Sequence, residues 1–347
     1  MPCFEATPVA DHQMAVRSRR VVRLGPVSVD IRSNEPDFKG FRFFCESFDA
    51  ERWGSGHMGA DFTLSFCNLA LDGPWSRQEL ARERDKNYRG GRMSVGYYLT
   101  DHFGAAAYLM TRGSHTWIFA EDFEPILWPY AIKHLLTLYS LEHGLLHLKA
   151  AGIEVNGQGA LLVGRGGSGK TVLLHQLCRT GARFLSNTHT LVEDQKLIGI
   201  RTALRVRADR FFGPIIRARG LSANVKAAEY TADPLRDLDW PSAREAPIRS
   251  VCLLDYRGPE HCIIREIDQN VLFDYMEQFS LAVSVYGLKD DVLDLVEGDV
   301  ARFSSEMSRM RTHLRTVIER SRCYYLSCDA EDPKNLSVIS ALLGAPP

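Results

Sequence analysis

The strongest constraint on this chain is a glycine-rich stretch near its middle. Residues 164–171 read GRGGSGKT and match the phosphate-binding pattern G-x-x-x-x-G-K-[ST]. An apolar run at 160–163 precedes this stretch, and apolar residues at helical spacing follow it from Val172 to Leu177. Because the pattern binds phosphate when a strand enters it and a helix leaves it, the context predicts a phosphate-binding loop in an α/β protein.

Each residue type in the loop has a physical role. Glycines lack a Cβ, so the backbone can turn its N–H groups around an anion, and the following helix adds free N–H donors and a positive dipole end. Lys170 is expected to supply a charge for the β and γ phosphates, and the Thr171 hydroxyl to ligate Mg²⁺. Arg165 is a candidate contact for phosphate or acceptor. The predicted nucleotide-binding residues are Gly164, Arg165, Gly166, Gly167, Ser168, Gly169, Lys170 and Thr171.

Composition narrows the class of protein. The chain has 347 residues, of which 45% are hydrophobic and 24% charged, and this describes a soluble globular protein of about two domains. A formal net charge of -1 gives no general attraction to nucleic acid or to an anionic membrane. No apolar run has membrane-spanning length, and the N-terminus has no hydrophobic signal region. We therefore expect a cytoplasmic protein with neither a nucleic-acid nor a membrane partner.

Changes of periodicity divide the chain into four parts. Residues 1–20 are expected to form a flexible polar arm, and residues 21–125 an antiparallel, β-rich N-terminal domain. Helical spacing over 126–144 predicts a connecting helix, and 145–347 then form the domain that carries the loop. The strands of the β-rich domain are expected at 21–32, as a hairpin around Gly25-Pro26, and at 40–48, 62–69, 92–99, 105–110 and 116–120.

Two strands joined by a tight turn are expected directly before the loop. They cover 145–155 and 159–163, and Asn156-Gly157 is a dipeptide that favours hairpin turns. After the loop, a short helix is expected to end near Thr180-Gly181, and a strand resumes at 183–186. The order of strand pair, loop and short helix is unusual for a common GTPase or ABC layout.

Two further features admit more than one interpretation. Six arginines between 201 and 219 form either a cationic wall for a charged acceptor or the solvated side of an edge strand, and their alternation with apolar residues favours the edge strand. The hydrophobic strand 248–254 ends in Asp255. Asp255 is either a magnesium ligand of the Walker B kind or the first residue of a surface turn.

These residues resemble the HPr kinase/phosphorylase group and the HPr-kinase-like proteins of biosynthetic clusters. The resemblance is carried by the order H-x-x-A-A-G-x-x-V-N-G-x-G, a strand, G-R-G-G-S-G-K-T, a short helix and G-A-R-F-L-S-N. It covers 145–210 well and 248–345 loosely, and it says little about 1–120. The resemblance implies a P-loop kinase core of the HPr kinase/PEP carboxykinase type, which phosphorylates protein serine, peptides or small molecules with ATP and Mg²⁺.

Two departures from that group concern the chemistry. Asn187 and Thr188 stand where the group has an Asp, often an acidic pair, that acts as base and metal partner. Asn can orient a hydroxyl but cannot accept a proton. The group also has a His in the preceding strand at about the place of Lys149, with His147 two residues away and on the same strand face.

His189 is a candidate replacement for the missing carboxylate. It follows Asn187 by two residues and shares its face if the strand continues, so that a neutral imidazole there can take a proton. For His189 and His147 alike, a buried histidine without a chemical role is the alternative. The predicted catalytic residues are Lys170, His189, Asn187 and His147, and the predicted metal ligands are Thr171 and Asp255.

The sequence therefore predicts a phosphotransferase that uses ATP and Mg²⁺ to phosphorylate a hydroxyl of a small molecule or peptide. A nucleotide-binding degenerate kinase with a regulatory or scaffold role is the alternative that Asn187 supports, and a simple ATPase is a third. The choice between ATP and GTP stays open, as does the formation of a homo-oligomer.

Overall fold

The chain divides into two compact units, 1–132 and 133–347. The division falls inside the stretch 126–144 for which the sequence predicts a connecting helix. The computed structural model describes residues 14–45, 60–71, 89–93, 96–99, 107–112, 114–123, 126, 131–223, 229–259 and 261–344. Residues 1–13 of the expected arm lie outside these ranges, whereas Ser18–Arg20 already belong to the first strand.

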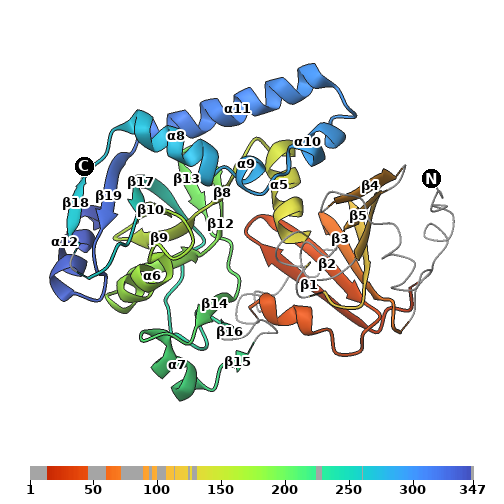
Figure 1. The fold of residues 1–347 in the computed structure, drawn as a ribbon, viewed down its shortest axis with the longest axis horizontal. Coiled ribbons are helices and arrows are strands. Elements are labelled where there is room, and N and C mark those ends of the chain that lie inside the picture. Colours follow the sequence, from red (N-terminus) through yellow and green to blue (C-terminus); the bar gives the residue numbers. More distant parts are fainter. Residues whose placement is uncertain are drawn as a thin grey trace. The chain divides into compact units, whose positions relative to one another are not determined.

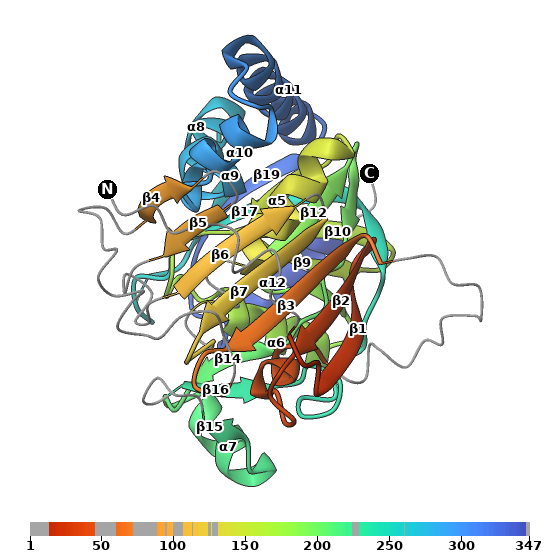
Figure 2. The same cartoon turned by 90° about the vertical axis from the view of Figure 1, so that its right-hand side faces the viewer.

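The described part of the first unit contains one sheet, with the strand order β1-β2-β3-β7-β6-β5-β4 (Figure 2). The hairpin expected at 21–32 is confirmed, since β1 and β2 pair antiparallel around Gly25, whose φ is +65°. The bounds are β1 Ser18–Leu24, β2 Val27–Ser33, β3 Phe62–Asn68, β4 Arg89–Met93, β5 Gly96–Leu99, β6 Ala107–Arg112 and β7 His115–Ala120.

Three expectations for this unit are wrong. The single strand expected at 92–99 is divided between β4 and β5, which pair antiparallel with each other. β3 runs parallel to both β2 and β7, so the sheet is mixed and not antiparallel. Alternating burial is the same in both directions of pairing, so a single strand's pattern does not encode its partner's direction. The strand expected at 40–48 begins as a 3-10 helix at Lys39–Phe43, and 46–48 lie outside the described residues. There Phe38 stacks on Phe66 with ring centroids 4.9 Å apart, so burial of aromatic rings replaces strand pairing.

The second unit is built on a sheet with the strand order β11-β9-β10-β17-β13-β12-β8; in addition, β19 pairs with β17, and β18 pairs with β19 (Figure 1). β10 and β19 both run parallel to β17. This mixed α/β arrangement with parallel strands is compatible with a P-loop-like fold. The bounds are β8 Leu146–Lys149, β9 Ala151–Val155, β10 Gln158–Val163, β11 Arg183–Ser186, β12 His189–Glu193, β13 Lys196–Ile198, β17 Glu245–Leu254, β18 Ile263–Glu266 and β19 Arg322–Ser327.

The strand pair before the loop has one expected and one unexpected feature. β9 and β10 form the predicted hairpin, with φ of +50° at Asn156 and +82° at Gly157. The single strand expected over 145–155 is instead two strands, because the chain leaves β8 at Ala150 and enters β9. The Thr190 hydroxyl donates to the Ala150 carbonyl over 2.9 Å at this crossing. All residues nearby suit a strand, so the break depends on this distant partner.

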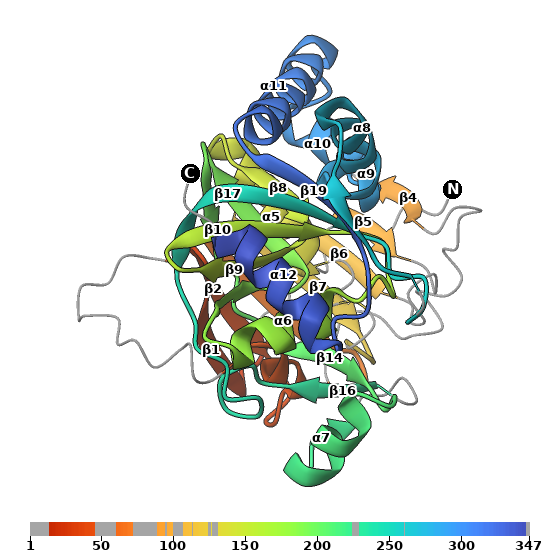
Figure 3. The ribbon, with the colours of Figure 1, turned by 90° about the vertical axis from the view of Figure 1, so that its left-hand side faces the viewer.

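Helices cover both faces of the central sheet. α12 lies over β9 and β10 beside α6, which contacts β11 (Figure 3), while α5, α9 and α11 contact β8. α6 buries Leu173, Leu174 and Leu177, which the helical spacing predicts. The bounds are α5 Lys133–Glu142, α6 Lys170–Arg179, α7 Phe212–Arg219, α8 Gln269–Phe279, α9 Ala282–Val285, α10 Lys289–Leu295, α11 Val300–Glu319 and α12 Pro333–Gly344.

The arginine-rich segment contains a strand and a helix. Strands β14 (Leu204–Arg207), β16 (Glu229–Ala232) and β15 (Ser222–Ala223) form a small sheet in that order, so β14 is an edge strand with alternating exposed arginines, as the period predicts. The second half of the segment is α7 and not strand. The Asp209 carboxylate accepts from the backbone N–H of Phe212 over 2.7 Å, which starts this helix.

Among the described residues, no helix combines the length and the apolar character needed to cross a membrane.

Candidate functional site

The glycine-rich loop (Gly164–Thr171) lies at the carboxyl ends of three neighbouring parallel strands, β10, β17 and β19. Open α/β sheets bind ligands at this edge. The loop packs closely on β17 at Gly164. A Cβ there would lie 2.6 Å from the Ser168 Oγ and nearer still to the Leu254 carbonyl oxygen. Glycine is therefore required at this position by space, in addition to its φ of +150°.

The Lys170 side chain folds back over the loop. Its Nζ donates to the carbonyl oxygens of Gly164 over 2.7 Å and Arg165 over 2.9 Å, and to the Ser168 Oγ over 3.1 Å. Burial, followed by the charge of Lys149, lowers the Lys170 pKa to about 8. These three acceptors are neutral, so the ammonium stands above the loop with its charge uncompensated by them. An anion bound at the loop would supply that compensation.

Helix α6 starts directly from the loop. Its N-cap is Gly169, with φ of +88°, and no side chain caps the first turn. The free N–H groups and the positive end of the helix dipole therefore face the loop. Together with Lys170 they make the end of β10 a favourable place for a negatively charged group.

Asn187 contacts the loop, as its place in the sequence suggests. β11 ends at Ser186, and the next residue brings its Oδ1 to within 3.2 Å of the Thr171 Oγ1, which donates to it. A hydroxyl and an amide oxygen suit Mg²⁺ only if phosphates and water supply most of its ligands. Among the described residues, no three or more His, Cys, Asp or Glu side chains are grouped to hold a metal ion.

Asp255 follows β17 and is engaged by two side chains. It accepts hydrogen bonds from the Arg257 Nε over 2.8 Å and from the Tyr325 hydroxyl over 2.9 Å. Desolvation raises its pKa, but these hydrogen bonds outweigh that effect and hold the pKa of the carboxyl below its usual value. Asp255 is therefore an ionised group at the loop's edge of the sheet, already paired with a cation.

His147 and His189 lie in the interior, under Tyr286. The His147 Nε2 is 2.9 Å from the His189 Nδ1, and the His147 Nδ1 is 2.9 Å from the Thr137 Oγ1. Both residues are at most 2% exposed. Burial, and then the charge of Lys133, lowers the His147 pKa to about 3, and burial lowers that of His189 well below its usual value. Both rings are therefore neutral and buried among side chains of the second unit.

The sequence places His189 on the same strand face as Asn187 on the condition that one strand runs through both residues, and this condition is not met. β11 ends at Ser186 and β12 begins only at His189, with a bend between them, so Asn187 and His189 are not two residues of one continuous strand. Lys149 pairs with His189 across β8 and β12. Among the candidates His147, Lys149, Asn187 and His189, only Lys149 lowers the Lys170 pKa through its charge.

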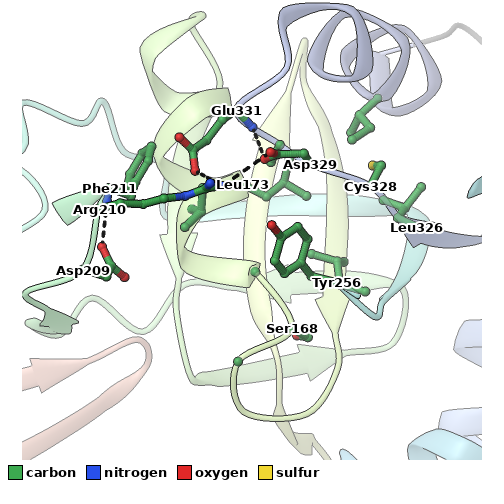
Figure 4. Close-up of a pocket in the computed structure, with 16 residues that line it drawn as sticks. Ser168, Leu173, Asp209, Arg210, Phe211, Tyr256, Leu326, Cys328, Asp329 and Glu331 are labelled. Carbon is green, nitrogen blue, oxygen red and sulfur yellow. Dashed lines mark hydrogen bonds and ion pairs between the residues drawn. The ribbon is translucent and has the colours of Figure 1, made fainter. Parts of the chain in front are cut away.

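A cavity of about 370 Å³ opens beside the loop (Figure 4). One wall is the loop at 167–169, and Tyr256 stands close by, with its Cβ 3.6 Å from the place a Gly169 Cβ would occupy. The opposite rim is polar, because Arg210 donates to Glu331 over 3.0 Å and lies 3.5 Å from Asp329. The remaining lining is largely apolar and includes Val172, Leu173, Phe211, Leu254, Leu326, Cys328, Ala330 and Ile339.

Sequence reasoning did not find the cavity. Its residues come from α6, from the turn after β17, from the end of β19, from α12 and from the segment before α7, and no motif links them. Apart from the loop at 167–169, only the Asp255-Tyr256 turn and the arginine-rich segment that contains Arg210 carried a signal. That signal did not say that both segments lie beside the same loop.

Comparisons with known proteins add little to this geometry. No protein-family model matches the chain, and no curated protein matches its sequence. Among solved structures, the Hpr(Ser) kinase/phosphatase from Coxiella burnetii is similar over 35% of this chain and 76% of its own, with 18% sequence identity and a TM-score of 0.21. A TM-score this low carries no argument about fold or function.

Proposed function

We propose that this protein is a phosphotransferase that binds ATP with Mg²⁺ at the glycine-rich loop and phosphorylates a hydroxyl of a small molecule or peptide. The observation that carries the proposal is Lys170, whose ammonium has only neutral acceptors among the described residues and stands over a loop that opens a helix at the ends of parallel strands. The loop N–H groups cradle the β and γ phosphates, and Lys170 exchanges its loop acceptors for phosphate oxygens.

The cavity beside the loop is suited to the nucleoside. Its apolar lining and the ring of Tyr256 can enclose a base, while the rim formed by Glu331 and Asp329 presents acceptors for sugar hydroxyls. The phosphate chain then leads from the cavity over the loop toward Thr171 and Asn187. Mg²⁺ would be held by the Thr171 hydroxyl and the phosphates, where it neutralises charge that develops on the transferring group.

The transfer step requires no strong base on the chain. The acceptor oxygen bonds to the γ-phosphorus, the bond from phosphorus to the β,γ-bridging oxygen breaks, and ADP departs with that electron pair. The hydroxyl proton passes to a phosphoryl oxygen and then to water, because Asn187 accepts no proton. In a loose transition state, positioning and charge stabilisation dominate, so Asn187 acts by orienting the acceptor. Buried His147 and His189 then hold strand β8, and with it Lys149, in place.

A non-catalytic nucleotide-binding role is the second candidate, favoured by the lack of a carboxylate in the contact between Asn187 and Thr171. Asn187→Asp separates the two. It raises γ-³²P transfer at least about tenfold if the site only lacks a base, since general-base catalysis contributes about 10²–10⁴-fold.

The wild-type chain is assayed beside Asn187→Asp over a panel of hydroxyl acceptors, with Lys289→Ala, on an exposed position of α10, as the matched control. Tight ATP binding by both proteins without transfer from either would refute the phosphotransferase and support the non-catalytic role. A loss of transfer in Asn187→Asp would mean that the amide itself is needed for orientation.

A further inference from the structure

A group of cations lies around Tyr286, outside the glycine-rich loop. We call Lys133, Lys149 and Arg205 the basic cluster. The Lys133 Nζ stands 4.2 Å above the centroid of the Tyr286 ring. Lys149 ends β8, opposite His189, whose ring centroid is 5.7 Å from that of Tyr286.

The charges of the basic cluster are poorly compensated. In the described part of the chain, neither Lys133 nor Lys149 has a carboxylate partner, and Arg205 is 4.0 Å from its one acidic neighbour, Glu229. Burial, and then the charges of Arg205 and Lys149, lowers the Lys133 pKa to about 8. The neutral histidines beneath add no charge of either sign. An anion bound among these side chains would compensate their positive charge.

The Tyr286 hydroxyl gives an independent indication. Its oxygen is buried, and no hydrogen-bond partner for it lies among the described residues. Buried hydroxyls are nearly always paired, so an unpaired one marks a place where a ligand or water completes the bonding. Burial raises the Tyr286 pKa, so this hydroxyl keeps its proton and acts as a donor. Like the cations of the basic cluster, the hydroxyl is therefore a hydrogen-bond donor that an anionic acceptor would satisfy.

We infer that the basic cluster and the Tyr286 hydroxyl bind a carboxylate or phosphate group of the acceptor. The inference rests on the proposed function and defines its substrate class as a hydroxyl compound that carries an anionic group. Lys149 ends β8 opposite His189, whose ring lies beside Tyr286, and its charge also lowers the Lys170 pKa, so it stands between the basic cluster and the glycine-rich loop. The anionic group anchors the acceptor near the transferred phosphoryl group, and Asn187 orients the hydroxyl.

The test measures binding of inorganic phosphate and of succinate to the full chain by isothermal titration calorimetry, with glycerol as the uncharged probe. One background is the chain saturated with Mg²⁺ and a non-hydrolysable ATP analogue, so that the loop is occupied. The other is nucleotide-free Lys170→Ala, which needs no nucleotide binding. We expect one or both anions to bind in each background, with Lys133→Gln and Tyr286→Phe weakening that binding at least fivefold and threefold. The phosphate and succinate titrations decide which group the site takes.

Three controls keep this test sharp. Lys133→Arg retains the charge and is expected to bind within twofold of the parent protein, and Lys289→Gln is expected to change nothing. Circular dichroism shows whether each variant is folded. Absence of anion binding in both backgrounds, or unchanged affinity in folded Lys133→Gln, would overturn the inference. Failure of the analogue to bind, with anion binding intact in Lys170→Ala, would count against the proposed function alone.

Discussion

Replacing Gly164 by alanine tests the tightest point of the glycine-rich loop. The added methyl would lie 2.6 Å from the Ser168 Oγ and still nearer the backbone oxygen of Leu254, and real Cβ atoms do not approach other atoms so closely. The backbone of β17 cannot turn away as a flexible side chain can. Overpacking of this kind costs about 1–3 kcal/mol, and the φ of +150° adds strain of about 1 kcal/mol.

We therefore expect Gly164→Ala to lower the free energy of unfolding by about 2–4 kcal/mol, which corresponds to a Tm lower by about 5–15 °C for a unit of this size. The loop supplies its own graded controls. A Cβ at Gly166 meets nothing within 4 Å, and Gly166 has no positive φ, so Gly166→Ala is expected to stay within about 0.5 kcal/mol of the parent. Gly167 is equally open but has φ of +82°, and its replacement by alanine costs about 1–2 kcal/mol.

The assay is urea unfolding of the nucleotide-free chain, followed by tryptophan fluorescence and far-UV circular dichroism. Nucleotide-free conditions matter because a ligand would add its own stabilisation. The expected order of stability is Gly166→Ala, then Gly167→Ala, then Gly164→Ala. Equal stability of the Gly164 and Gly166 variants, or a Gly166 variant that is the least stable, would refute the packing of the loop on β17.

Three further predictions concern the loop, the cavity and the core. Because the Lys170 pKa is lowered to about 8, the affinity for a Mg²⁺–ATP analogue should fall as the pH rises through 8, where the free protein loses the charge that the phosphates require. In calorimetric titrations between pH 7 and 9.5, Lys170→Arg should make the affinity nearly independent of pH. An equally steep decline in affinity for this variant would contradict the prediction. Phe211→Ala should weaken binding of ATP about tenfold and leave binding of tripolyphosphate unchanged, since only the nucleoside enters the cavity; equal losses for both ligands would place the nucleoside elsewhere. The buried Trp240 Nε1 donates to the His175 Nδ1 over 3.1 Å. Trp240→Phe should therefore lower the free energy of unfolding by about 1–3 kcal/mol more than the loss of side-chain volume alone, because it leaves a buried acceptor unpaired. Adding His175→Leu removes that acceptor and should recover part of the loss in urea unfolding, whereas additive losses for the two substitutions would argue against the hydrogen bond.

Local patterns in the sequence predicted the elements near the loop well. The hairpin turn at Asn156-Gly157, the strand that enters the loop and the helix that buries Leu173 are all found, because each depends on neighbours within a few residues. Asn187, which the sequence places just after the strand that follows the short helix, contacts Thr171 in the structure. The roles proposed for these residues stay predictions until nucleotide binding is measured.

Errors arose where distant segments decide the outcome. The direction of β3 depends on β2 and β7, and the break at Ala150 on a hydroxyl from β12. His147 and Lys149 share a strand face in the sequence pattern, yet burial under Tyr286 removes His147 from solvent while Lys149 stays half-exposed and acts on Lys170. Strand periodicity states which side a residue faces but not what covers that side.

The sequence by itself determined that a glycine-rich loop stands between a strand and a helix, and that an amide, Asn187, follows it closely. Both features depend only on residue types and on their spacing over a few residues, and these can be read directly from the sequence. The tertiary structure alone decided that a cavity adjoins the loop, that the candidate histidines are buried, and that the Lys133 ammonium stands over the Tyr286 ring, whose hydroxyl has no partner among the described residues. Those features depend on which strands become neighbours, and that choice is made by burial of the whole core, since local spacing leaves many pairings open.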